Sequence, residues 1–470
     1  MTSTDQELLA HARWLRQPIS KWPFVLVAVL SSGLCVFAPV IGRGRLLARR
    51  NLEQSSRELK NLSAVDLDDR ENAAAVWKNA FPLIVAGSGK KDDPLAEETD
   101  WSSVDLYLQS SPARLLLAQN DAALQLADQA AAMPRVNWNL DYEAGITVNL
   151  SHLKPLRTLV KLVAMRARIA AYDGDWAMVE KSLRTVTCAG AQVGAARPLV
   201  CKLLDLTAHR IACHSLEDCL NVPRSPKWRV DRVVLARLQS FVKEQMDRHT
   251  DILEGLKFEE LSALKMMDLC GSGEVSMTQL SGAPEKTPFL TSYYSIRYLD
   301  DRSLFEQSLK PIHADAGNDS LEFEQAFRDT CQTNGQFAKE HGLMLTSLML
   351  PMLGRTPKAE RVRRGDWQLA SIALQALERR WRDGAFPQSL AQLGWVSGEL
   401  KNPIDRRYAE LQCSVATDGS FWIWCQWSGD PESSGLQPDE LKDRNAIMRQ
   451  RDQDLVFRIS PIDLKAPSEK

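Results

Sequence analysis

The residues best able to do chemistry in this chain are seven histidines and nine cysteines, and their spacing fits no metal or redox motif. No histidine pair has the HExxH spacing of zinc enzymes, and no cysteine pair has the CxxC spacing of zinc or thioredoxin-type sites. The only local cluster joins His209, Cys213, His214 and Cys219. Residues five or six apart do not share a helix face, so this cluster does not predict a metal site.

One cysteine pair has two interpretations. Cys413 and Cys425 flank Thr417-Asp418-Gly419, a sequence typical of a tight turn between strands. If the two strands pair, the sequence is consistent with two states of Cys413 and Cys425. One is a disulfide between them, and the other is a pair of half-buried free thiols.

Nucleophile and phosphate motifs are absent from the sequence. No GxSxG is present, and Ser272 in Gly271-Ser272-Gly273 lacks the strand and helix that a nucleophile elbow needs. The stretch GSGKKDD at 87–93 is not a phosphate loop, because Ile84 stands where that motif needs glycine. We therefore predict no catalytic residue and no bound cofactor.

The thirteen tryptophans include a group near the C-terminus, Trp422, Trp424 and Trp427. Strict alternation in a strand places Trp422 and Trp424 on the same face. That face either packs on the helix predicted at 366–382, which we favour, or is exposed as a surface for a partner protein.

Length and charge limit the class of protein. The chain has 470 residues, Lys+Arg 58 against Asp+Glu 60 and a net charge of −2. This balance lacks the basic excess of nucleic-acid-binding proteins, so we expect no nucleic-acid partner. The hydrophobic fraction of 44% suits a chain with a large folded core.

The strongest signal in the sequence is an uncharged stretch from Trp22 to Gly42. Its length matches a helix that crosses the hydrocarbon of a bilayer, with Lys21 on one side and Arg43 and Arg45 on the other. A cleaved signal peptide is the competing interpretation, but Pro39 would follow the cleavage site and the stretch is long for that role. We predict a single-pass signal anchor in contact with the lipid bilayer.

The rest of the chain reads as mainly α-helical. The helix that begins near Leu156 should end at Gly174, and Asp175 should cap the next helix, which predicts an antiparallel hairpin like those of tetratricopeptide arrays. One long helical stretch is expected over 230–269, and the uncharged 342–353 is read as a buried core helix that ends at Pro351. Short strands at 412–415 and 421–427 predict a hairpin near the C-terminus.

Four segments carry a family resemblance: NAAAVWKNAFPLI, MPRVNWNLDYEAG, HLKPLRTLVKLVAMRARIAAYDGDW and LASIALQALERRWRDGAFPQSLAQL. Together they resemble uncharacterised bacterial membrane-anchored proteins with helical soluble domains. In that group the last part, here 370–429, resembles the globular domain of the type II secretion pseudopilin G family. Pseudopilins of that family can hold calcium in a loop near the end of this domain. In the matching loop here, 428–432, Asp430 and Glu432 are the only charged oxygen donors.

These observations predict five segments: an N-terminal tail at 1–21, a transmembrane helix at 22–42, a helical soluble domain at 43–365, a pseudopilin-like α+β lobe at 366–430 and a polar tail at 431–470. The fold class is an irregular antiparallel helical array with a small α+β lobe. The function hypothesis is a non-catalytic interaction or assembly protein of the cell envelope, with its soluble part outside the cytoplasm and a protein as partner. The alternatives are an envelope hydrolase with dispersed site residues and a secretion-system component.

Overall fold

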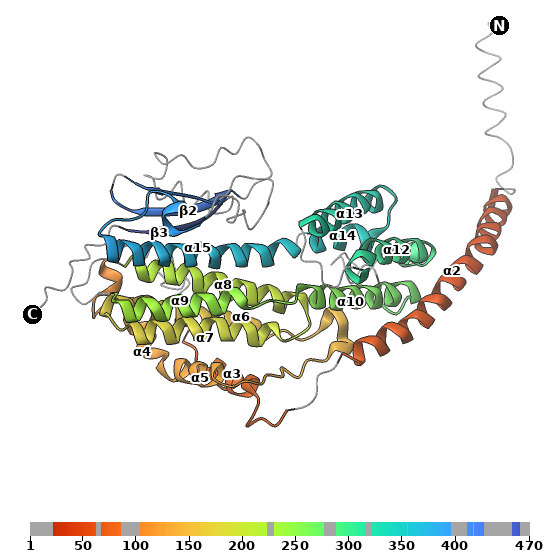
Figure 1. Ribbon diagram of the computed structural model, residues 1–470. Coiled ribbons are helices and arrows are strands. Elements are labelled where there is room, and N and C mark those ends of the chain that lie inside the picture. Colours follow the sequence, from red (N-terminus) through yellow and green to blue (C-terminus); the bar gives the residue numbers. More distant parts are fainter. Residues whose placement is uncertain are drawn as a thin grey trace, which may run out of the picture.

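The chain is mainly α-helical with a small antiparallel sheet, as Figure 1 shows. The computed structural model describes residues 22–62, 67–85, 104–222, 230–276, 288–314, 321–354, 356–395, 411–416, 418–426 and 454–460. The described α-helices are α2 (Trp22–Lys60), α3 (Ala73–Ala80), α4 (Pro112–Gln119), α5 (Asp121–Ala131), α6 (Leu153–Asp173), α7 (Trp176–Gly194), α8 (Leu199–Leu220), α9 (Arg232–Asp247), α10 (Ile252–Ser272), α12 (Pro288–Ala314), α13 (Leu321–Glu340), α14 (Met344–Leu353) and α15 (Pro357–Asp383).

Short 3-10 helices connect several of these elements: η2 (Phe81–Leu83), η3 (Val104–Tyr107), η4 (Tyr142–Thr147) and η5 (Leu390–Leu393). The strands among the described residues are β1 (Gln412–Val415), β2 (Phe421–Gln426) and β3 (Asp454–Ile459). The mainly helical fold with a small sheet near the C-terminus is thus confirmed.

The hairpin of α6 and α7 forms where the sequence places it. Gly174 adopts a left-handed conformation (φ 79°) at the end of α6, which glycine tolerates without steric cost. The Asp175 side chain accepts a hydrogen bond from the backbone N–H of Met178 at 3.0 Å and so caps α7. Helices α6, α7 and α8 lie side by side in the middle of the molecule (Figure 1).

Two apolar cores divide the helical body. The larger core contains α3 to α9, α15 and one face of the sheet, and includes Leu183, Val186, Trp367 and Phe421. The second core gathers α10, α12, α13 and α14, with Leu256, Phe305 and Phe327 at its centre. Leu199 and Leu206 on α8 belong to the second core, so α8 contributes to both.

The α9 to α10 region differs from the single long helix expected over 230–269. Helix α9 ends at Asp247, and α10 begins at Ile252 after the Asp251 side chain accepts from the Glu254 N–H at 2.9 Å. An aspartate that caps a new helix offers the backbone an alternative to continuing the old one. The break creates a corner, and the polar residues of this corner are central to the candidate site.

The sheet has the order β1-β2-β3, and the hairpin of β1 and β2 is confirmed. Phe421, Ile423 and Cys425 join the larger core, while Trp422 and Trp424 form a separate cluster with Val456 on the opposite face. The favoured packing of the two tryptophans on the helix is therefore wrong, because the alternate residues of β2 take that position. Strand β3 lies in the segment expected as a polar tail, where it pairs with β2.

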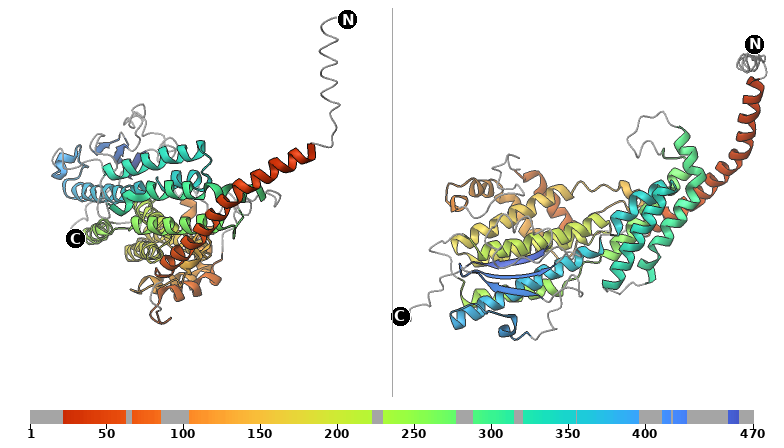
Figure 2. Two further views of the ribbon diagram at one scale, coloured as in Figure 1. Left: turned by 90° about the vertical axis from the view of Figure 1, so that its right-hand side faces the viewer. Right: turned by 90° about the horizontal axis from the view of Figure 1, so that it is seen from above.

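Helix α2 is one continuous helix of 39 residues that begins with the predicted membrane span. The side chains of 22–37 lie outside those that the structure describes. Within the described residues, no helix combines the length and the apolar character needed to cross a bilayer. Figures 1 and 2 show α2 leaving the body beside α10 and α12, at the end opposite the sheet.

Candidate functional site

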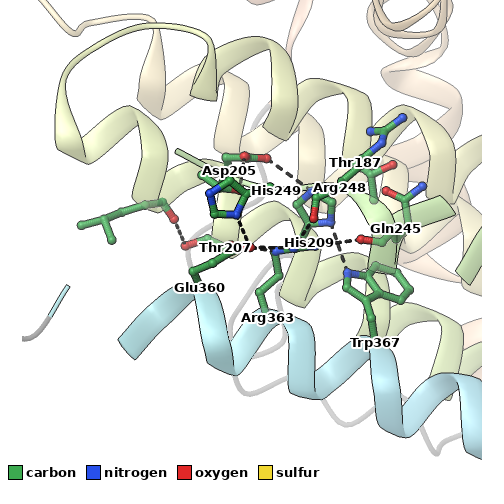
Figure 3. A network of polar contacts seen from close by, with 12 residues as sticks. Thr187, Asp205, Thr207, His209, Gln245, Arg248, His249, Glu360, Arg363 and Trp367 are labelled. Atoms are coloured by element: carbon green, nitrogen blue, oxygen red, sulfur yellow. Dashed lines mark hydrogen bonds and ion pairs between the residues drawn. The ribbon is translucent and has the colours of Figure 1, made fainter. Parts of the chain in front are cut away.

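The main polar cluster in the interior lies where α15 meets the corner between α9 and α10. We call it the Glu360 cluster: Glu360, Arg363, Arg364, His249 and the carbonyl groups of Gln245 and Arg248. Arg363 donates from Nε to Glu360 Oε2 at 2.9 Å and from Nη2 to Oε1 at 2.7 Å. Figure 3 shows this two-point contact, which is among the stronger polar interactions in proteins. Both side chains are almost fully buried.

Arg363 also closes the end of α9. Its Nη1 donates to the carbonyl oxygen of Gln245 at 2.8 Å and its Nη2 to that of Arg248 at 2.5 Å. The last carbonyls of a helix have no partner within the helix, and a buried guanidinium satisfies them here. Arg363 therefore connects α15 to the end of α9 through two carbonyl groups at once.

The charge state of Glu360 follows from these contacts. Burial alone would raise its pKa, but hydrogen bonds from His249 and Arg363 outweigh burial and lower the pKa of Glu360 to about 2. His249 Nδ1 lies 3.3 Å from Glu360 Oε1, and Arg364 Nε donates to the same oxygen at 3.2 Å. Glu360 is thus ionised and committed to its own partners.

A second layer of the site lies on α8. Trp367 Nε1 donates to His209 Nδ1 at 3.2 Å, which leaves the His209 proton on Nε2, 3.5 Å from Asp205 Oδ1. Thr250 donates to Asp205 Oδ2 at 2.7 Å. Burial raises the pKa of Asp205 to about 6 and lowers that of His209 to about 3, so the imidazole is neutral.

The backbone of α7 makes room for this carboxyl group. A β-carbon at Gly190 would lie 2.8 Å from Asp205 Oδ1, and one at Gly194 would lie 2.8 Å from Asp205 Cβ. Larger residues at either glycine would displace Asp205. The pair of glycines therefore lets α7 approach α8 closely at Asp205 and, in the case of Gly190, also at Ala208.

Asp205 and His209 resemble an acid and base pair in residue type, but both are closed to solvent. Their exposed fractions are 5% and 2%. A general acid or base has to reach a substrate proton within hydrogen-bond distance. In this conformation the two side chains hold α7, α8 and α15 together.

An open groove runs along the outer side of α8 and α15. It has a volume of about 270 Å³ and its floor is mostly apolar. Its lining residues are Leu203, Leu206, Thr207, Arg210, Lys358, Ala359, Val362, Arg363 and Asp366. Arg363 contributes to both the groove and the Glu360 cluster, whereas Asp205 and His209 are not among the lining residues.

A second hollow, of about 460 Å³, lies near α3 and is polar. Its wall includes Asn72, whose amide donates to the Asn137 carbonyl and accepts from the Asn137 and Ala74 N–H groups. The amide of Asn72 is thus used to join α3 to the segment at 137.

A second buried polar cluster fixes α2 to the body. We call it the Asp268 cluster: Asp268, Ser55, Asn51, Tyr298 and Arg302. Tyr298 and Arg302 donate to Asp268 Oδ1 at 2.5 and 2.7 Å, Ser55 donates to Oδ2 at 2.9 Å, and Asn51 donates to the Tyr298 hydroxyl at 2.8 Å. Burial raises the pKa of Asp268 despite these contacts.

Glycine and alanine bring α2 close to its neighbours. Ala48 is fully buried, and a β-carbon at Gly44 would overlap the carbonyl oxygen of Ser295 on α12. The face of α2 that contains Gly44, Ala48, Ser55 and Leu59 is buried, at the spacing of a helix stripe. Helix α2 is therefore attached rigidly to α10 and α12 over its second half.

The residues singled out in the sequence are dispersed. Trp422 and Trp424 have exposed fractions of 4% and 3%, so they do not form an open surface. Trp427, Asp430 and Glu432 lie outside the described residues. Within the described part of the chain, no three His, Cys, Asp or Glu side chains form a group that could hold a metal ion.

Cys413 and Cys425 are free thiols. The register places Cys413 opposite Ile423 and Cys425 opposite Leu455, so the two cysteines are diagonal neighbours on one face. Diagonal positions are separated by about 7–8 Å, beyond the usual span of a disulfide. The disulfide interpretation does not fit this register.

Comparison of the chain with protein-family models, with curated proteins and with solved structures gave no match. The groove and the two polar clusters are therefore the features that bear on function. Sequence reasoning missed Asp205 and Glu360, although a local signal existed for each. Asp205 and His209 are four apart on α8, and Glu360 and Arg363 are three apart on α15, the spacings at which helix side chains meet.

Proposed function

We propose that this chain is a membrane-anchored, non-catalytic interaction or assembly protein of the cell envelope, and that the groove between α8 and α15 receives a segment of a partner protein. One observation carries this proposal. The groove has an open, mostly apolar floor, while Asp205 and His209, whose pKa values are strongly shifted, lie buried away from it. An enzyme site is expected to combine the cavity with such groups.

The lining of the groove indicates the chemistry of the partner. Leu203, Leu206 and Val362 offer apolar contacts. The charged lining residues are the cationic Arg210, Lys358 and Arg363 and the acidic Asp366, so positive charge prevails. An amphipathic helix with apolar residues on one side and acidic residues beside them fits such a lining. The rigid attachment of Arg363 beneath the groove keeps its floor in place before binding.

The anchor in this proposal is the stretch from Trp22 to Gly42, with a single pass through the bilayer. Its support comes from the sequence, which has no charged residue over a length that suits a membrane helix. The continuous α2 and the Asp268 cluster add that the body would stand at a fixed distance from the membrane. We place the body outside the cytoplasm, as part of the same proposal.

A matched pair of substitutions tests the groove. Ala359 is half-buried on the groove floor and Ala122 is exposed on α5, so Ala359→Arg fills the groove while Ala122→Arg adds the same side chain elsewhere. Full-length protein would be extracted with its native membrane and its associated proteins identified by mass spectrometry. We expect a partner enriched with the wild type and Ala122→Arg but lost with Ala359→Arg. Retention of the same proteins by Ala359→Arg would refute the role of the groove.

The rival function, an envelope hydrolase, rests on the Asp205 and His209 pair. A carboxyl group whose pKa is raised to about 6 by burial is typical of acid–base sites as well as of structural clusters. If the pair were catalytic, Asp205→Asn would abolish a hydrolytic activity of the purified protein. The role of a secretion-system component rests on the pseudopilin-like resemblance of 370–429 and is an analogy of fold.

A further inference from the structure

Helix α14 carries an apolar stripe that faces solvent. The ten residues of α14 include no charged side chain. Leu348 and Met352 have exposed fractions of 66% and 73%, and Pro351 between them is exposed too. Residues four apart lie on the same helix face, and Met344, half-buried, extends the stripe by one more turn.

This exposure corrects the sequence interpretation of 342–353 as a buried core helix. Leu345, Leu350 and Leu353 on the opposite face of α14 are buried in the second core, and the half-buried Met344 and Met349 pack against its edge. A helix that is apolar on all sides is typical of a protein interior or of a lipid environment. The outer face of α14 is not covered by the protein interior, and the position of α14 in the molecule indicates whether lipid covers it.

The position of α14 is fixed relative to α2. The backbone N–H groups of Leu345 and Thr346 donate to the Asp301 carboxylate at 3.2 and 3.1 Å, which joins the start of α14 to α12. The same helix α12 contacts α2 at Ser295 and Tyr298. Figures 1 and 2 agree that α12, α13 and α14 gather at the end of the body where α2 departs.

The charges on α2 favour lipid as the neighbour of this end. Directly after Gly42, four exposed arginines follow in eight positions: Arg43, Arg45, Arg49 and Arg50. The first acidic residue of α2 is Glu53. Cationic side chains beside a membrane helix attract anionic lipid headgroups near the surface. A basic segment of α2 and an exposed apolar helix at the same end of the body together suit a membrane interface.

We propose that the α14 stripe, Met344, Leu348, Pro351 and Met352, rests in the lipid interface beside α2 and gives the body a second membrane contact. This inference depends on the proposed anchor at 22–42. The body then has a fixed orientation on the membrane, with α12 to α14 at the lipid and the groove of α8 and α15 farther along the molecule. A protein partner or a second copy on α14 would instead keep lipid away from it.

The test uses full-length protein reconstituted in vesicles of phosphatidylcholine and phosphatidylglycerol that contain a photoactivatable acyl chain. After illumination and proteolysis, mass spectrometry locates the labelled peptides. We expect label in 22–42 and in 344–353. We expect none at Leu115, which has an exposed fraction of 58% but lies on α4, a helix of the larger core. Label in 22–42 without label in 344–353 overturns this inference and leaves the anchor intact. Absence of label from 22–42 overturns the anchor itself.

A matched pair of variants sharpens the result. Leu348→Asp places a charge in the stripe at a solvent-facing position, so the fold should persist, and Leu115→Asp does the same far from it. Leu348→Asp should lose the label in 344–353 and keep the label in 22–42, while Leu115→Asp should change neither. Undiminished labelling of α14 in Leu348→Asp would count against contact through the stripe. Circular dichroism of both variants checks that the helices are retained.

Discussion

The Glu360 cluster and the Asp268 cluster each bury a carboxyl group, but the pKa of that group shifts in opposite directions. Glu360 and Asp268 are both buried carboxyl groups beside an arginine, with exposed fractions of 4% and 0%. Yet the pKa of Glu360 is lowered to about 2, whereas the pKa of Asp268 is raised. Burial disfavours the charge in both, so the difference must come from the donors.

The donors differ in charge and in number of contacts. Glu360 accepts from two guanidinium groups, and one of them, Arg363, is held in place by the carbonyls of Gln245 and Arg248. Asp268 accepts from one guanidinium and from neutral hydroxyl groups of Tyr298 and Ser55. Neutral donors compensate burial less well than charged ones. The carboxyl group that joins α15 to the end of α9 thus has a lowered pKa, whereas the one that joins α2 to the body has a raised pKa.

The largest effect should come from Arg363→Met. It leaves Glu360 with a weaker set of donors and two carbonyls at the end of α9 without their partner. Removal of one member of a buried ion pair costs about 3–5 kcal/mol of the free energy of unfolding. Chemical denaturation of the full-length protein in detergent measures it.

Arg364→Met is the control for that substitution. Arg364 contacts the same Glu360 oxygen, but its side chain is 39% exposed. Exposed ion pairs contribute about 1 kcal/mol or less. Equal losses of unfolding free energy in Arg363→Met and Arg364→Met would show that the burial of Arg363 adds nothing to stability.

Glu360→Gln should cost about 3 kcal/mol at neutral pH, as a lowering of the pKa from 4.5 to about 2 implies. The new amide would also point an N–H at Arg363 Nε, so two donors would face each other. Because the folded pKa is depressed, this stability is present above the ordinary pKa and is lost as pH falls toward 2. Urea denaturation of both proteins over a pH series checks this. If the difference in unfolding free energy between the wild type and Glu360→Gln stayed constant as pH fell toward 2, Glu360 would not have a lowered pKa in the folded protein.

The attachment of α2 can be tested by its close contact at Gly44. In Gly44→Ala the added methyl group overlaps the Ser295 carbonyl, and overpacking of this kind costs about 1–3 kcal/mol. We expect faster amide hydrogen exchange in α12 around Ser295. Gly42→Ala is the matched control, because a β-carbon at Gly42 meets nothing within 4 Å. Unchanged exchange in Gly44→Ala would mean that α2 is held loosely.

The sequence predicted what depends on neighbours along the chain. Gly174 and Asp175 gave the α6 and α7 hairpin, and period-two alternation placed Trp422 and Trp424 on one face of β2. It could not predict which face of β2 would meet α15, because both faces carry large apolar side chains.

The clusters themselves depend on contacts between distant segments. Ser55 and Asp268 are 213 residues apart, and Arg363 and Gln245 are 118 apart. No local pattern brings such residues together. The exposure of Leu348 was missed for the same reason, since a helix without charges reads as buried until its neighbours are known.

The smallest effect should come from Asp268→Asn, and its pH dependence should have the opposite sign to that of Glu360→Gln. The asparagine oxygen can still accept from Tyr298 and Arg302, and the Ser55 hydroxyl can accept from the new amide. At neutral pH we expect a change within about 1 kcal/mol, of either sign.

The raised pKa of Asp268 decides the direction of this pH dependence. Folded protein binds this proton more tightly than unfolded protein, so the Asp268 contribution to stability falls as pH rises above the ordinary value of 3.8. Asp268→Asn removes that decline, so its stability relative to the wild type should increase as pH rises. The stability of Glu360→Gln relative to the wild type should decrease as pH rises. The same urea series measures both variants. If both differences followed pH in the same direction, folding would lower the pKa of Asp268 as it lowers that of Glu360, and the donors around Asp268 would outweigh its burial.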